Sequence, residues 1–164
     1  MADLYSFNIN KYILGLLLIL SFASCKNLKK VAEASPTQKS VIVLNPPFEM
    51  MGLDRSRQIR IYLPINYSLS DKKYPVLYMH DGQNLFEDST SYVGEWGVDE
   101  SLDSLSVSNH LDFIAVGIDN GQGRRIHGLS SWQNEKYGKA EGEAYMVFIV
   151  KQIKPYIDST YRTL

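Results

Sequence analysis

The sequence contains a single cysteine, no excess of positive charge and no apolar run long enough to cross a bilayer. One cysteine among 164 residues cannot form a disulfide within the chain or build a zinc site from several thiolates. The 17 Lys and Arg residues are balanced by 18 Asp and Glu residues, so no surplus of cations is present to neutralise nucleic-acid phosphates. We therefore expect neither a disulfide-linked scaffold nor a nucleic-acid-binding protein.

Several familiar site motifs are also missing. The three histidines lack metal-ligand spacing, and no His-Glu-x-x-His is present. The segment Gly121-Gln122-Gly123 lacks the third glycine of a dinucleotide-binding loop. The serine-nucleophile motif Gly-x-Ser-x-Gly is absent too, because Gly128-Leu129-Ser130-Ser131-Trp132 departs from it at the last position. We predict no metal and no cofactor.

What is present is the composition of a folded protein. Apolar residues make up 45% of the chain and charged residues 21%, which are ordinary globular values. A disordered chain would contain fewer apolar residues and carry a larger net charge than the −1 found here. The length predicts one domain.

The N-terminal segment has the pattern of an export signal. Lys11 precedes an uncharged stretch of 14 residues, Tyr12 to Cys25, whereas a membrane-spanning helix needs roughly 20 residues. Such a stretch fits the hydrophobic region of a signal peptide. A buried core helix is the alternative.

The end of this stretch, Phe22-Ala23-Ser24-Cys25, resembles the lipobox of bacterial lipoproteins, with an apolar residue, two small residues and the only cysteine. The resemblance implies that Cys25 becomes the lipidated N-terminus of an exported protein, anchored through its lipid to the membrane of the bacterial cell envelope. We therefore expect a lipoprotein signal over 1–24, a polar tether over 25–40 and a folded domain over 41–164. A plain secretory signal with an incidental cysteine is the alternative.

The domain is predicted to open with antiparallel strands. Val41–Leu44 is a short β-branched run, and Arg57–Leu63 alternates polar and apolar residues with the period of a half-buried strand. Leu53–Ser56, between these runs, suits a hairpin connection.

Two further runs predict the interior of a sheet. Pro75–His80 and Asp112–Ile118 are continuously apolar over most of their length, which is typical of strands buried on both faces. Val98, Leu102 and Leu105 lie between them at helical spacing. Strand, helix and strand form a βαβ unit, so the two strands are expected to be parallel.

The last segment predicts a helix. Apolar residues recur at helical spacing at Met146, Ile149, Val150, Ile153 and Ile157. Pro155 is expected to kink or shorten this helix.

Ligand-binding residues are expected at the carboxyl ends of the parallel strands, where open α/β sheets place their sites. The loops there, His80–Phe86 and Asp119–Arg125, are rich in hydrogen-bonding groups. Asp81, Asn84 and Asn120 are the substrate-binding candidates, and simple strand-ending turns are the alternative.

Other residues near these loops have two interpretations each. Trp132 is a candidate for stacking on sugar or phenolic rings, with core or lid packing as the alternative. Gly117–Gly121 has the form of a nucleophile elbow with Asp119 in place of serine, which makes Asp119 an alternative nucleophile. Arg124 and Arg125 either pair with an anionic substrate group or form a solvated surface pair.

Four motifs occur in a specific order along the domain: Tyr74–Phe86, Gly94–Glu100, Val116–Gly121, and Lys154–Asp158 with Tyr161–Thr163. Together they resemble the branch of the α/β-hydrolases that contains esterase D, enterochelin esterases and feruloyl or acetyl xylan esterases. The resemblance spans roughly Val41 to Leu164. It implies an α/β-hydrolase-like fold with an antiparallel hairpin, then parallel strands with flanking helices.

The same resemblance implies a serine carboxylic-ester hydrolase that acts on small-molecule esters, such as acylated carbohydrates, feruloyl esters or siderophores. In that chemistry a serine attacks the ester, a histidine takes its proton, and backbone N–H groups hold the oxyanion. Here the Gly82–Gln83 loop is implied to supply one oxyanion donor, with Gly82 allowing a close approach of the backbone.

One departure from the family is large. Its serine motif follows the helix that corresponds to Lys154–Tyr161, so the resemblance places the serine, the acid and the histidine beyond Leu164. We expect an N-terminal part of an esterase domain, truncated before the nucleophile elbow and inactive alone. A non-catalytic envelope lipoprotein with a hydrolase-like binding scaffold is the alternative.

Overall fold

The computed structural model describes residues 41–164. The predicted signal over 1–24, the tether over 25–40 and the lipidation site Cys25 lie outside the described residues, so these assignments stay predictions. Among residues 41–164, no helix has the length and apolar character needed to cross a membrane.

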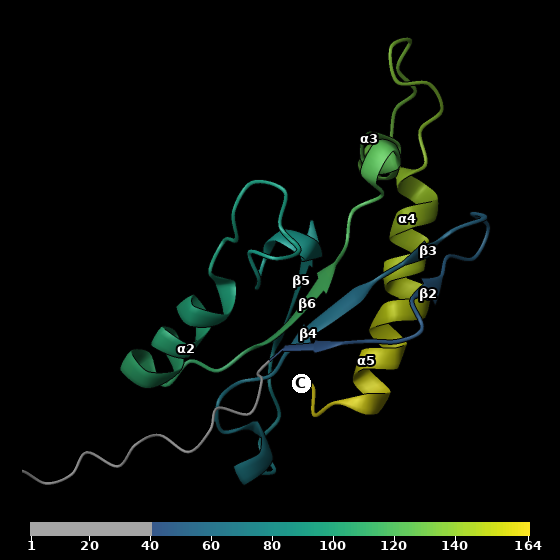
Figure 1. Ribbon diagram of the computed structural model, residues 1–164. Helices are drawn as coiled ribbons and strands as arrows, with labels where there is room; N and C mark the ends of the chain where they lie inside the picture. The colour runs from purple at the N-terminus through teal and green to yellow at the C-terminus, as the bar shows by residue number, and fades with distance from the viewer. Residues whose placement is uncertain (1–40) are drawn as a thin grey trace, which may run out of the picture. The chain divides into compact units, whose positions relative to one another are not determined.

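The core of the fold is a four-stranded sheet in the order β1-β4-β6-β5 (Figure 1). Its strands are β1 (Val41–Val43), β4 (Ile59–Tyr62), β5 (Val76–His80) and β6 (Ile114–Ile118). The pairs β1–β4 and β4–β6 are antiparallel, and β5–β6 is parallel. The predicted antiparallel opening and the predicted parallel pair are therefore both present.

A small second ribbon brings one arginine toward the end of β6. It consists of β2 (Phe48–Glu49) and β3 (Ser56–Arg57), paired so that Phe48 faces Arg57. Directly after it, the carbonyl of Gln58 accepts a hydrogen bond from the amide of Asp119 at 3.0 Å. This bond holds Arg57 beside the loop that follows β6.

Helices cover both faces of the sheet (Figure 1). On one face, α2 (Val98–Asn109) contributes Leu102 to a buried cluster completed by Val41, Tyr62, Leu85, Phe86 and Ala115. On the other face lie α4 (Gly142–Phe148), a π-helical turn (Ile149–Ile153) and α5 (Lys154–Thr160). These pack on the inward side chains of β4 and β6, among them Ile59, Ile61, Ile114, Val116 and Ile118.

Burial along two strands differs from the prediction. All four residues of β4 are buried, although the alternating pattern predicts a half-buried strand. The polar positions are covered because the Tyr62 hydroxyl donates to Asp103 of α2 at 2.6 Å, and Arg60 pairs with Asp119. In contrast, β5 is only partly buried, with Leu77 38% exposed, because it forms one edge of the sheet in the described part of the chain.

The C-terminal residues run along the start of that edge. Tyr74 and Thr163 form an isolated parallel bridge. The Tyr74 amide donates to the carbonyl of Arg162 at 2.9 Å, and the Leu164 amide donates to the carbonyl of Tyr74 at 3.0 Å.

The predicted last helix is present, but its buried face is different. Met146 and Val150 are 52% and 45% exposed, whereas Ile149, Ile153 and Ile157 are buried as predicted. Two residues outside the predicted stripe, Tyr145 and Phe148, are buried in the place of the exposed pair. Pro155 lies in the first turn of α5, directly after the π-helical turn, so the helix is interrupted near the expected position.

Candidate active site at the ends of the parallel strands

The turn after β5 is held close against β6. Asp81 has a left-handed backbone with φ of 55°, and a 3-10 turn follows over Gly82–Asn84. A Cβ on Gly82 would lie 2.7 Å from the carbonyl carbon of Gly117 and 2.8 Å from the nitrogen of Ile118. Glycine is therefore needed at position 82 because two backbone segments approach closely there. The residue of this turn with a positive φ is Asp81, not Gly82.

Two backbone amides in this turn are without acceptors. Asn84 and Leu85 donate their amides to the carbonyls of Asp81 and Gly82, at 2.8 and 3.3 Å. Among residues 41–164, the amides of Gly82 and Gln83 donate to no acceptor. This follows from their place at the start of a helical turn, where N–H groups have no partner within the turn. Gly82 is buried and Gln83 half-buried, so these donors differ from ordinary buried amides, which are nearly always paired.

The loops after β5 and β6 are hydrogen-bonded to each other. The Gln83 side-chain oxygen accepts the amide of Asn120 at 3.0 Å, and the Asn120 side chain donates to Asp81 at 2.9 Å. From the sequence we expected both loops at one edge of the sheet, but we expected only the backbone of Gln83 to have a role. Its side chain also positions the second loop.

Asp81 is held by an arginine from that second loop. Arg125, the first residue of α3 (Arg125–Leu129), donates through Nε and Nη2 to the two carboxylate oxygens of Asp81, at 2.8 and 2.7 Å. This hydrogen bonding to Arg125 lowers the pKa of the Asp81 carboxyl, so the carboxylate stays ionised. Asp81 therefore fixes the turn, and the surface pair considered for Arg124 and Arg125 is instead an ion pair between Arg125 and Asp81.

Asp119 is engaged in a second bidentate ion pair. Arg60 of β4 donates to both carboxylate oxygens of Asp119, at 2.8 and 3.0 Å. A carboxylate bound in this way on both oxygens is poorly placed to attack a substrate. The structure thus disfavours Asp119 as a nucleophile.

A hollow of about 230 Å³, open to solvent, lies between the two loops and α4. Its lining comprises Arg57, His80, Asp81, Asp119, Asn120, Gly121, Arg125, Gly128, Leu129 and Tyr145. Inside it, Nδ1 of His80 and the hydroxyl of Tyr145 are 2.9 Å apart. Burial raises the pKa of Tyr145 to about 12, so its phenol is neutral near pH 7. No cluster of His, Cys, Asp or Glu in the described part of the chain is arranged to hold a metal ion.

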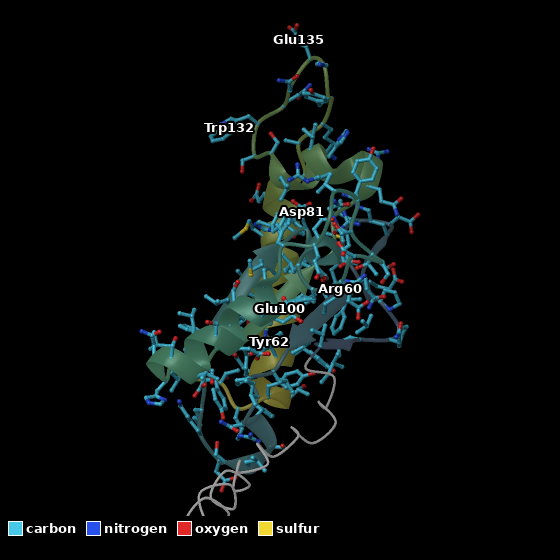
Figure 2. The ribbon with its side chains drawn as sticks, turned by 60° about the vertical axis from the view of Figure 1, so that its left-hand side comes forward. Arg60, Tyr62, Asp81, Glu100, Trp132 and Glu135 are labelled. Atoms are coloured by element: carbon cyan, nitrogen blue, oxygen red, sulfur yellow. The ribbon has the colours of Figure 1, made fainter. Side chains whose placement is uncertain are left out.

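Two predicted substrate-binding residues lie outside this pocket. Asn84 is buried, and its side-chain oxygen accepts hydrogen bonds from Ser91 and Tyr92, both at 3.2 Å. Trp132 is 81% exposed on a loop that projects beyond Asp81 (Figure 2), where it borders a separate hollow of about 160 Å³. The structure thus brings Asp81 and Asn120 to the pocket, but not Asn84 or Trp132.

Three pocket residues were missed by sequence reasoning. Arg57 and Tyr145 belong to a strand and a helix that were predicted from their apolar pattern alone. His80 was expected in the candidate loop His80–Phe86 but was not singled out as a site residue. The available signal was the polar character of Arg57 and His80 at the ends of expected strands, and Tyr145 had no such signal.

Comparisons with known proteins agree with this architecture. A family model described as "Putative esterase" matches residues 51–164. A crystal structure of the BES protein from Bacillus cereus aligns with a TM-score of 0.61 at 18% identity, covering 81% of this chain and 51% of that protein. The siderophore hydrolase EstB from Aspergillus nidulans aligns with a TM-score of 0.56 at 17% identity, covering 78% and 46%.

An IroE-like serine hydrolase from Shewanella oneidensis is similar as well, with a TM-score of 0.52 at 26% identity, covering 75% of this chain and 39% of that protein. The chain therefore spans about half, or less, of the length of these solved structures. The family assignment rests on the match over residues 51–164, and the sheet order and the helices on both faces agree with it. This chain belongs to the esterase family of α/β-hydrolase-like proteins.

Proposed function

We propose that the protein is a carboxylic-ester hydrolase in which the turn at Gly82 and Gln83 supplies one half of the oxyanion hole. The observation that carries the proposal is the pair of amides without acceptors at the carboxyl end of β5. Ester cleavage builds negative charge on the carbonyl oxygen. Fixed N–H donors aimed at that charge are a large part of catalysis in acyl transfer.

The turn has little freedom to move. The backbone of Gly82 packs directly against the backbone at the end of β6, which limits its movement. Asp81 is fixed by Arg125, and the Gln83 side chain is tied to the amide of Asn120. Donors held in this way need no reorganisation when charge develops, which is the condition for strong electrostatic stabilisation.

The remaining chemistry is that of the family. A serine on a sharp turn attacks the ester, a histidine acts as base, and the amide after the serine completes the oxyanion hole. No Gly-x-Ser-x-Gly occurs among the 164 residues. We therefore propose that these residues alone do not turn over esters, and that the turn acts in a protein that contains that motif.

The substrates we propose are small-molecule esters of the acylated-carbohydrate, feruloyl or siderophore type. Support comes from the family membership and from the similarity to an IroE-like serine hydrolase at 26% identity.

Two substitutions at Gln83 test the oxyanion role, made in the complete gene product and assayed on p-nitrophenyl acetate. Gln83→Pro removes the amide hydrogen together with the side chain, whereas Gln83→Ala removes only the side chain. We expect Gln83→Pro to lower kcat by about 10²–10³ relative to Gln83→Ala, the usual cost of one oxyanion donor. Circular dichroism melts must first show that both variants are folded.

Equal rates in two folded variants would remove this amide from the mechanism. Complete inactivity of the unmodified gene product toward esters would instead favour the non-catalytic binding scaffold.

We also propose that the protein is anchored to the cell envelope through acyl chains on Cys25, because Phe22-Ala23-Ser24-Cys25 matches a lipobox. Two or more chains on one residue give stable anchoring. Cys25→Ala should move the protein out of the membrane fraction of lysed cells. Ser24→Ala, which keeps a small residue before the cysteine, should stay in it. Membrane association of Cys25→Ala at the unmodified level would contradict the anchor.

A further inference from the structure

The pocket between the two loops contains one guanidinium without an anionic partner. The other charged side chains there are paired: Asp81 with Arg125, and Asp119 with Arg60. Arg57 is the exception.

The neutral polar side chains of the pocket each have at least one hydrogen-bond partner. His80 and Tyr145 share a hydrogen bond. The Asn120 side chain donates to Asp81 and accepts the amide of Gln122 at 2.8 Å. Among the charged side chains of the pocket, Arg57 is therefore the one without a partner of opposite charge in residues 41–164.

Arg57 is buried, with 7% of its surface exposed, and it borders the pocket. An arginine carries five N–H donors. The one hydrogen bond that the Arg57 side chain makes within residues 41–164 runs from Nη1 to the carbonyl of Ser56, at 3.0 Å. No ion pair within these residues includes it. Gly121 leaves room for the guanidinium of Arg57, because a Cβ on residue 121 would collide with Nη2 of Arg57.

The surroundings of Arg57 leave its positive charge poorly compensated. Burial and the neighbouring Arg55 lower the pKa of Arg57. The carboxylates of Glu141 and Asp119 act in the opposite direction, but each already has its own arginine, Arg55 and Arg60. A buried cation without a partner is costly. A bound anion would remove that cost.

We propose that Arg57 binds a carboxylate carried by the substrate, so that the preferred substrates are esters with a free carboxylate. This inference rests on the proposed esterase function. Arginine suits a carboxylate because its fork of N–H groups matches the two oxygens, and one unpaired cation matches one negative charge. The hollow beside Arg57 is open to solvent, so a carboxylate-bearing arm of the substrate would approach the guanidinium from outside.

The rest of the pocket is consistent with such an arm. Leu129, Gly128 and the ring of Tyr145 provide apolar wall beside the guanidinium. Asp81 and Asn120 border the pocket and are also bonded into the turn that carries the free amides. The pocket that contains Arg57 therefore lies next to the turn that carries the free amides.

Binding and turnover test the proposal separately, on the complete gene product. In the binding experiment, butyrate and its neutral isostere butyramide are titrated by calorimetry. Arg57→Gln should weaken butyrate binding at least tenfold more than butyramide binding, while Arg57→Lys retains part of the affinity for butyrate. Arg124→Gln is the matched control, because Arg124 is exposed and does not border the pocket.

In the turnover experiment, kcat/KM is compared for mono-p-nitrophenyl succinate and p-nitrophenyl butyrate. The unmodified protein should prefer the succinate ester, and Arg57→Gln should reduce this preference about tenfold, because kcat/KM should fall more for the succinate ester than for the neutral ester. Preference and butyrate affinity that persist in a folded Arg57→Gln variant would overturn the proposal. Butyrate binding that depends on Arg57, without hydrolysis of either ester, would contradict the esterase function but keep the anion site.

Discussion

Two aspartates of this domain show how local surroundings give the same carboxyl group opposite effects on stability. Asp81 accepts hydrogen bonds from Arg125 and Asn120, and its pKa is lowered. Its contribution to stability is present above the ordinary carboxyl pKa near 4 and is lost as the pH falls below it. The same contacts hold its left-handed backbone, a conformation that a non-glycine residue adopts only when its surroundings enforce it.

Asp99 is the opposite case. It lies in the first turn of α2, where one carboxylate oxygen is buried without a partner. Burial, and then the nearby Glu100, raise the pKa of Asp99 to about 6. The folded protein therefore holds a proton that the unfolded chain has released between pH 4 and 6, so stability falls as the pH rises through this range.

We predict that Asp99→Asn stabilises the protein at pH 8 and has little effect at pH 4.5. The gain should be about 1 kcal/mol, less than full linkage would give, because the carboxyl is partly open to water. Melting temperatures of the complete gene product at the two pH values provide the measurement. Glu135→Gln, on an exposed loop, is the control and should change neither value. An equal change at both pH values for Asp99→Asn would refute the titration argument.

At the scale of elements, the sequence predicted which segments form helices and strands better than which faces they bury. The last helix illustrates the reason. Residues 145–150 are six consecutive apolar side chains, which surround the helix, so helical periodicity cannot distinguish a face through Met146 and Val150 from one through Tyr145 and Phe148. The π-helical turn that follows shifts the register further, and no local pattern encodes it.

The strands show a related limit. Pro75–His80 and Asp112–Ile118 have similar apolar patterns, yet β6 is wholly buried and β5 is partly exposed. A pattern of apolar residues reports what a strand could bury, whereas its burial depends on which strands lie beside it. In the described residues β6 lies between β4 and β5, and β5 has a neighbour strand on one side only.

For the whole molecule, the loops of the candidate site were predictable, but their connections were not. Strand ends and family motifs located both loops at one edge of the sheet. The pairs that organise the site join residues 44 and 59 positions apart, Asp81 with Arg125 and Arg60 with Asp119. Which charges meet across such distances depends on strand order and register. Arg57 was missed for this reason, because its place beside the pocket follows from the pairing of β4 with β6.

The central claim, that the turn after β5 stabilises the oxyanion, is tested most directly by a crystal structure of a covalent adduct. The complete gene product would be treated with diethyl p-nitrophenyl phosphate, whose phosphoryl oxygen takes the place of the oxyanion once a serine has reacted. We predict that the amide nitrogen of Gln83 lies about 2.7–3.1 Å from that oxygen. A phosphoryl oxygen held by other donors, with the Gln83 amide more than about 4 Å away, would contradict the claim.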